Sequence, residues 1–150
     1  MNAIVGYRIA HWFYLHKLGI LAKLIRAFVY LIHNCYIPYT AEIGKDTKLG
    51  YKGIGVVIHS HAVIGEDCVI AQNVTIGGRE GHDGVPHIGN HVFVGAGAAV
   101  LGGVKIGDHV TVGANAVVLQ DIPDNCACVG VPARIISREG SSYGTSARKD

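Results

Sequence analysis

An aliphatic residue recurs at every sixth position through most of this chain, and that spacing limits the possible folds more than any other feature. A period of six fits neither an α-helical stripe nor an alternating strand. It predicts a left-handed parallel β-helix, a triangular solenoid in which three six-residue units form one coil and the aliphatic side chains fill the bore. With a slip of three residues after the second, the predicted bore positions are Ile43, Leu49, Ile58, Ile64, Ile70, Ile76, Ile88, Val94, Val100, Ile106, Val112 and Val118.

Two segments interrupt this rhythm. The stretch GYKGIG (50–55) adds three residues before Ile58, and the stretch GGREGHDGVPH (77–87) keeps the frame but would place His82 at a bore position. A buried, unpaired imidazole is costly. We therefore expect residues 77–87 to leave the solenoid as an external loop, and irregular loops on a rigid scaffold are where function tends to be found.

The hexad pattern divides the chain into three regions. Residues 1–40 lack the pattern and read as two short helices, 7–18 and 20–34, which would cap the open first coil. Residues 41–136 form the predicted β-helix. Residues 137–150 are polar and rich in Gly and Ser, and we expect them to be disordered.

The apolar run 20–32 raises the question of membrane contact. It is interrupted by Lys23 and Arg26 and is shorter than the roughly 20 apolar residues that a span needs. Two interpretations remain open, namely packing against the rest of the protein and peripheral contact with a membrane through the N-terminal helices.

Composition excludes some classes of function. A formal net charge of +2, without a basic cluster interleaved with aromatic residues, gives no indication of nucleic-acid binding. The four cysteines form no CxxC pair, and the N-terminus shows no signal peptide. We expect free thiols and a cytoplasmic location.

Small residues suggest where a ligand could approach the backbone. If residues about 18 apart stack on one corner, a column forms from His59-Ser60, Gly77-Gly78, Gly95-Ala96 and Gly113-Ala114. This column predicts either a groove for a narrow ligand, such as the pantetheine arm of CoA, or merely tight corners.

Histidines gather near the two irregular segments. If a hydroxyl is to attack a ligand held in such a groove, a base must take its proton, and imidazole suits this role because its pKa lies near working pH. His59 is the leading candidate because it stands at the foot of the small-residue column, and His82 and His87 on the loop are the others. His59-x-His61 could alternatively belong to a zinc site completed by His82 or His87, although we expect no metal.

Four stretches resemble those of the hexapeptide-repeat acyltransferases, in particular the serine acetyltransferase-like branch. They are QNVTIGG (72–78), VGAGAAVLGGVKIG (94–107), VGANAVVLQDIP (112–123) and GVPARII (130–136), and the resemblance covers about residues 41–136. It implies acetyl-CoA as co-substrate and a CoA cleft between adjacent subunits of a homotrimer. The residues that it places at CoA are Gly78, Ala96 and Ala114 through their backbone, Arg134 near the phosphates, and Lys105 as a weaker candidate.

The chain also departs from that branch. The family's Asp-His pair falls on Gly50 and either Tyr51 or Lys52, and its histidine before a proline in the loop falls on Val85. The short helical cap is more similar to the acetyltransferases of capsule and exopolysaccharide gene clusters. The expected acceptor is therefore a hydroxyl of an envelope sugar or of L-serine. A zinc hydratase of the γ-carbonic-anhydrase type and a non-catalytic trimeric scaffold are the alternatives.

Overall fold

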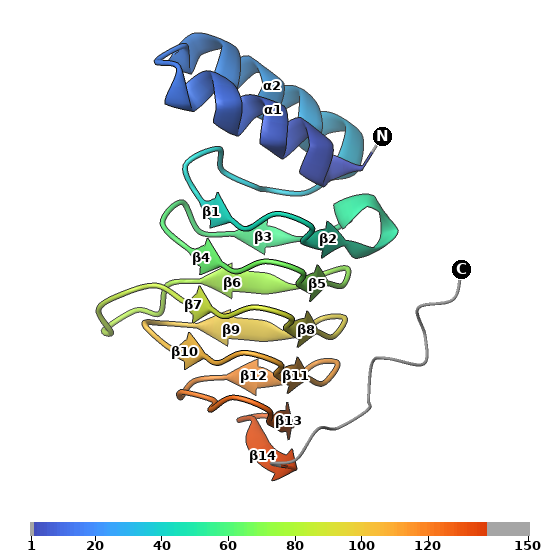
Figure 1. The fold of residues 1–150 in the computed structure, drawn as a ribbon, viewed down its shortest axis with the longest axis vertical. Helices are drawn as coiled ribbons and strands as arrows, with labels where there is room; N and C mark the ends of the chain where they lie inside the picture. The colour runs from blue at the N-terminus through green and yellow to red at the C-terminus, as the bar shows by residue number, and fades with distance from the viewer. Residues whose placement is uncertain (1, 138–150) are drawn as a thin grey trace.

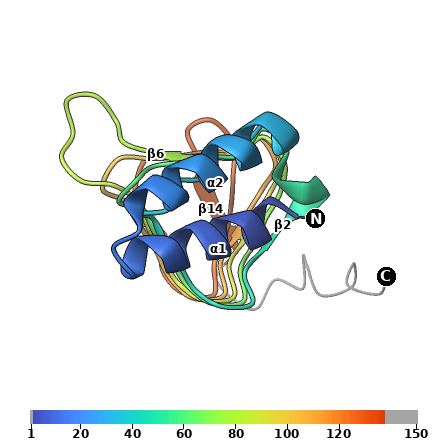
Figure 2. The same ribbon diagram turned by 90° about the horizontal axis from the view of Figure 1, so that it is seen from above.

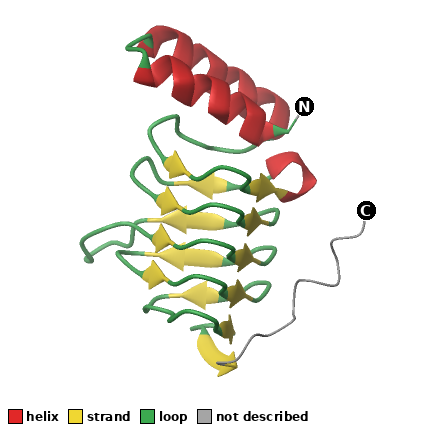
Figure 3. Cartoon of the chain, in the orientation of Figure 1, coloured by secondary structure: helices red, strands yellow, loops and turns green. Residues whose placement is uncertain are grey.

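The computed structural model describes residues 2–137 and shows a three-sided solenoid covered at one end by a helical hairpin (Figure 1). The hairpin consists of α1 (Ala3–Leu15) and α2 (Gly19–His33). Apart from one short 3-10 turn (Gly50–Gly53), the remaining elements are strands (Figure 3). The first twelve strands are β1 (Glu42–Ile43), β2 (Lys48–Leu49), β3 (Val57–Ile58), β4 (Val63–Ile64), β5 (Val69–Ile70), β6 (Thr75–Gly77), β7 (His87–Ile88), β8 (Phe93–Val94), β9 (Ala99–Leu101), β10 (Lys105–Ile106), β11 (Thr111–Val112) and β12 (Val117–Val118).

The strands form three sheets, one for each side of the prism. Their orders are β1-β4-β7-β10, β3-β6-β9-β12 and β2-β5-β8-β11-β13-β14. The last two strands of the third sheet are β13 (Ala127–Val129) and β14 (Arg134–Ser137), and β14 runs antiparallel whereas the other ladders are parallel. The prediction of a mainly β, left-handed parallel β-helix with a helical cap is confirmed.

The bore of the solenoid contains the side chains that the hexad pattern predicts. All twelve predicted bore positions are buried, and each lies in one of the strands β1 to β12. Stacked coils therefore share one continuous apolar core, which no single coil could bury alone.

A loop leaves the solenoid between β6 and β7 as predicted, and its residues 78–84 are all exposed. It is shorter than the predicted stretch 77–87, because Gly77 ends β6 and His87 begins β7. Its effect on stacking differs from our expectation. Ile76 pairs with Val100 and not with Val94, since the loop adds one full hexad. An insertion of that length preserves the hexad frame but places every later residue one side of the prism earlier than uninterrupted counting predicts.

The single column of small residues expected from the sequence is therefore wrong. Gly77 lies between His59 above and Leu101 below. Ala96 and Ala114 stack on another corner, where the Asn115 N–H donates to the Ala96 carbonyl at 2.8 Å.

The helices occupy nearly the predicted ranges. α1 begins earlier, at Ala3, because the Asn2 side chain caps it by accepting the Ile4 N–H at 3.2 Å. Tyr7 attaches the hairpin to the first coil by donating its hydroxyl to the Ala41 carbonyl at 2.7 Å. The expectation of a disordered tail falls, beyond Ser137, outside the described residues.

Truncation of a bore side chain should be far more destabilising than the same truncation on the outer surface. We expect Ile70→Ala, at a fully buried position, to lower the free energy of unfolding by about 2–5 kcal/mol through lost burial and a cavity. Val57→Ala, where the side chain is 44% exposed, should cost less than about 1 kcal/mol. Urea unfolding of both variants provides the measurement, and equal losses would contradict the packed-bore description.

Candidate functional site

The loop between β6 and β7 lies against the corner that follows β9. The Gly102 N–H donates to the Gly77 carbonyl at 2.9 Å, and within the loop the His82 N–H donates to the Arg79 carbonyl at 3.1 Å. A Cβ on Gly103 would lie 2.7 Å from the Asp83 carbonyl oxygen, which is closer than a real side chain tolerates. Glycine at this corner thus lets the loop fold onto the solenoid.

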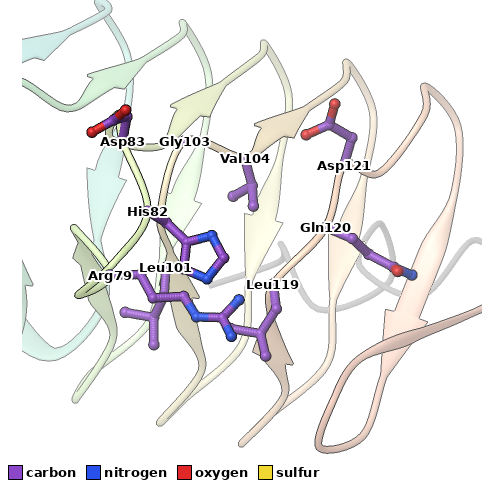
Figure 4. Close-up of a pocket in the computed structure, with 10 residues that line it drawn as sticks. Arg79, His82, Asp83, Leu101, Gly103, Val104, Leu119, Gln120 and Asp121 are labelled. Carbon is purple, nitrogen blue, oxygen red and sulfur yellow. The ribbon is translucent and has the colours of Figure 1, made fainter.

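A cavity of about 260 Å³ forms between the loop and the corners of the two following coils. Figure 4 shows the side chains of Arg79 and His82 pointing from the loop toward Leu101 and Leu119. Asp83, Gln120 and Asp121 also border the cavity. The cavity is smaller than most drug-sized ligand sites, so it suits a small molecule or the end of a long one.

His82 is the sequence-predicted histidine that lies in this cavity. No hydrogen bond to its ring nitrogens is present within residues 2–137, so both remain open to a ligand. Sequence reasoning did not single out Arg79, which lies beside it. A charged residue directly after the glycine pair 77–78 was the available signal, but only the folded loop shows that it shares a cavity with His82.

His59 stands on the corner above the point where the loop leaves. Its Nδ1 accepts the His61 backbone N–H at 3.2 Å, and its ring centroid is 5.6 Å from that of His61. A neutral imidazole that accepts through Nδ1 carries its proton on Nε2. In this tautomer the outer nitrogen of His59 is a hydrogen-bond donor rather than a base.

The third predicted histidine, His87, lies elsewhere. It begins β7 on the exposed outer face of the sheet β1-β4-β7-β10, directly beside Lys105 of β10. The structure thus places His59 and His82 near the corner where the loop leaves the solenoid. It places His87 beside Lys105 on the adjoining side of the prism.

The residues predicted to line CoA occupy two different corners. Gly78 lies at the loop corner, where a Cβ would meet no atom within 4 Å. Ala114 borders a second cavity of about 290 Å³ with Phe93, Val129 and Ile136, on the corner that carries Ala96. Arg134 is exposed on β14 and donates to the neighbouring Ala133 carbonyl at 3.0 Å.

The three-residue insertion forms a turn with unusual backbone geometry. Tyr51 (φ 47°) and Lys52 (φ 63°) both adopt left-handed conformations, which cost about 1–2 kcal/mol each for residues with a Cβ. The helical cap braces this turn, since the Asn34 carbonyl accepts the Gly55 N–H at 2.9 Å and the Asn2 side chain donates to the Leu49 carbonyl at 3.0 Å. Strain held by tertiary contacts is typical of functional turns.

The turn and the loop project from opposite ends of one sheet. The turn precedes β3 and the loop follows β6, and these strands are parallel neighbours in the sheet β3-β6-β9-β12. Figure 2 shows the loop and the turn on different sides of the prism. One chain therefore cannot bring Tyr51 or Lys52 into the cavity that contains His82.

The cysteines are not suited to nucleophilic chemistry. All four are buried free thiols, as expected, and burial raises the pKa of Cys35 and Cys128 to about 11. Among residues 2–137, no group of three or more His, Cys, Asp or Glu side chains is arranged to hold a metal ion.

Comparison with known proteins assigns this architecture to a class. The family model described as bacterial transferase hexapeptide (six repeats) matches residues 86–120. The structure of a serine acetyltransferase from Brucella abortus in complex with coenzyme A superposes with a TM-score of 0.86 at 34% identity, covering 92% of this chain and 56% of that one. The protein is thus a hexapeptide-repeat β-helix of the bacterial transferase class.

Sequence relatives narrow the assignment. A serine acetyltransferase of Synechococcus elongatus is 41% identical over 141 residues, which are 93% of this chain and 57% of the relative. One from Staphylococcus epidermidis is 36% identical over 146 residues, or 96% of this chain and 68% of the relative. The chain belongs to the serine acetyltransferase family, and it spans little more than half the length of the cyanobacterial relative.

A side chain at position 103 should displace the loop without unfolding the solenoid. We expect Gly103→Ala to push the Asp83 carbonyl away and to speed amide hydrogen exchange at His82 by at least about tenfold, because the loop loses its docked position. Gly78→Ala is the matched control, since its Cβ would meet nothing within 4 Å. Equal exchange rates at His82 in both variants would show that the loop does not depend on this contact.

Proposed function

We propose that the protein is an acetyl-CoA-dependent O-acetyltransferase that works in the cytoplasm on a hydroxyl of a small acceptor. The observation that carries this proposal is the cavity under the loop. His82 and Arg79 both line it, and it lies on a scaffold of the serine acetyltransferase family. The Brucella abortus relative is a complex with coenzyme A, which supports the choice of co-substrate.

His82 is the proposed general base. Its ring nitrogens are open to the cavity, whereas Nδ1 of His59 is engaged by a backbone N–H. The imidazole would take the hydroxyl proton as the acceptor oxygen attacks the thioester carbonyl carbon. The C–O bond forms, the C–S bond breaks, and the CoA thiolate leaves and takes up a proton. His59, with Nε2–H as a donor, and His87 are the remaining candidates for assisting roles.

The proposed CoA cleft lies between neighbouring subunits of a homotrimer. Gly78 and the cavity occupy one corner of the prism, and Ala96 and Ala114 occupy another. In a ring of three chains, the loop corner of one chain can face the Ala96–Ala114 corner of the next, which would unite these residues in a single cleft. Lys105 and Arg134, exposed on β10 and β14, are the proposed contacts to CoA phosphates.

For the acceptor we propose an envelope-type sugar before L-serine. A structure of the Neisseria gonorrhoeae family member is a complex with serine, which keeps L-serine as the second candidate. In this chain, however, the places of the family's Asp-His pair and loop histidine hold Gly50, Tyr51 or Lys52, and Val85. Arg79 would orient the carboxylate of L-serine or a phosphate carried by a sugar acceptor. The peripheral membrane contact expected of the N-terminal helices is likewise a proposal.

Loss of the His82 imidazole should abolish most of the activity. We expect His82→Ala to lower kcat about 10²-fold or more, the usual contribution of a general base. Release of CoA from acetyl-CoA is to be measured with a panel of L-serine and hexose acceptors, and kcat/KM should be highest for a hexose. His61→Ala, an exposed histidine near the same corner, is the control and should retain the wild-type rate. Full activity of His82→Ala with an inactive His59→Ala would transfer the role of base to His59.

Mixed trimers test the position of the cleft. His82→Ala damages the loop corner and Ala114→Trp blocks the other corner, so each variant alone should be inactive. Coexpression of the two in equal amounts should restore about a quarter of the wild-type activity, because that share of interfaces pairs an intact loop with an intact Ala114 corner. A cleft built within one chain would give no recovery.

A further inference from the structure

Most of the large apolar side chains that remain exposed belong to the helical cap. Along α2 they recur with helical spacing at Ile20, Leu24, Phe28 and Leu31, and Ile20 and Leu31 are about four-fifths exposed (78% and 80%). The opposite face of α2 contains the buried residues Ala22, Val29 and His33, of which Val29 belongs to the core cluster shared with α1 and the solenoid. α2 is therefore apolar on two faces, only one of which the described part of the chain covers.

α1 also has one buried face and one exposed apolar face. Val5, Ile9 and Trp12 follow one another at helical spacing and are 45%, 43% and 52% exposed. Its buried face consists of Ala3, Gly6, Tyr7 and Ala10. The two helices lie side by side over the end of the solenoid (Figure 2), and they leave an exposed apolar surface on its cap, which we call the cap surface (Val5, Ile9, Trp12, Ile20, Leu24, Phe28 and Leu31).

The charges of this region have a single sign. Residues 1–41 contain no Asp or Glu but contain Arg8, Lys17, Lys23 and Arg26. Arg8 donates to the carbonyls of Ile43 and Gly44 in the first coil, so it belongs to the internal attachment of the hairpin. Lys17 and Lys23 are exposed, and they place positive charge beside the apolar side chains.

A hollow of about 430 Å³ at the end of α2 combines apolar side chains with a positive charge. It is lined by Arg26, Ala27, Tyr30, Leu31 and Tyr36, and Arg26 is positioned by its hydrogen bond to the Tyr36 hydroxyl at 2.9 Å. A guanidinium beside tyrosine rings and aliphatic walls matches the boundary between an anionic head group and an acyl chain.

We infer that the cap surface binds to the surface of an anionic lipid bilayer, with the helices lying in the interface and the solenoid directed away from it. Apolar side chains would enter the boundary of the head groups and acyl chains, and Lys17, Lys23 and Arg26 would meet lipid phosphates. Neither α1 (13 residues) nor α2 (15 residues), the helices of the described chain, could cross the membrane, so the contact is peripheral.

Charge favours lipid over a second copy of the chain. A two-fold contact through the cap surface would bring together the cations of two hairpins that contain no carboxylate to neutralise them. The inference deepens the proposed membrane contact and does not depend on acetyl transfer.

Vesicle sedimentation tests it with the full chain and without acetyl-CoA. We expect the wild-type protein to bind vesicles of phosphatidylcholine and phosphatidylglycerol (7:3) at least about tenfold more tightly than vesicles of phosphatidylcholine alone, and to be released by high salt. Leu24→Gln/Leu31→Gln should weaken binding at least about tenfold, and Lys17→Gln/Lys23→Gln should weaken it about fivefold for each lysine.

Matched controls change the same residue types outside the cap surface. Ile136→Gln removes an exposed aliphatic side chain on β14, and Lys48→Gln removes an exposed cation on β2, and both should bind vesicles like the wild type. Sedimentation velocity of the same variants reports self-association. Vesicle binding that is equal for all variants, or absent for the wild type, would refute the inference. A dimer that dissociates in Leu24→Gln/Leu31→Gln while vesicles are not bound would assign the cap surface to a second copy.

Discussion

The stacking of aliphatic side chains in the bore is the interaction on which the rest of this structure depends. Each strand buries one residue of the hexad, and that residue lies over the corresponding residue of the next coil, as Ile70 lies over Val94 and Val94 over Val112. The strands are too short to be stable alone, so the burial of one coil depends on its neighbours. The helical hairpin closes the first coil, and the antiparallel β14 ends the sheet at the other end.

Two short insertions project from this rigid prism and form the features that we relate to function. Three residues inserted before β3 produce a strained turn at Tyr51 and Lys52, held by the end of α2, whereas the insertion after β6 produces a loop that folds over the next corners. The two features lie at opposite ends of one sheet. Any reaction that uses both must therefore combine two chains, which is the physical basis for proposing a cleft between subunits.

The same architecture separates the proposed roles along its axis. The hairpin carries the exposed apolar and cationic residues at one end, while the cavity with His82 and Arg79 lies on the side, beside the later coils. A cap resting on lipid would leave the loop corner accessible to acceptor and acetyl-CoA. Burial of Tyr7 and Val29 beneath the hairpin makes the cap part of the solenoid's core rather than a loose appendage.

The hexad spacing by itself determined the fold, because a continuous core requires one inward residue in every six-residue unit. It also correctly assigned residues such as Ile58 and Val112 to the bore. It also identified the stretch 77–87 as a loop, since His82 could not occupy the bore. What it could not supply was the side of the prism on which later residues lie. A loop of one hexad leaves the linear pattern unchanged but rotates Ala96 and Ala114 away from His59, and only the pairing of Ile76 with Val100 reveals this. The meeting of Arg79 and His82 in one cavity was likewise decided by tertiary structure, because it depends on how the loop folds back onto Gly103.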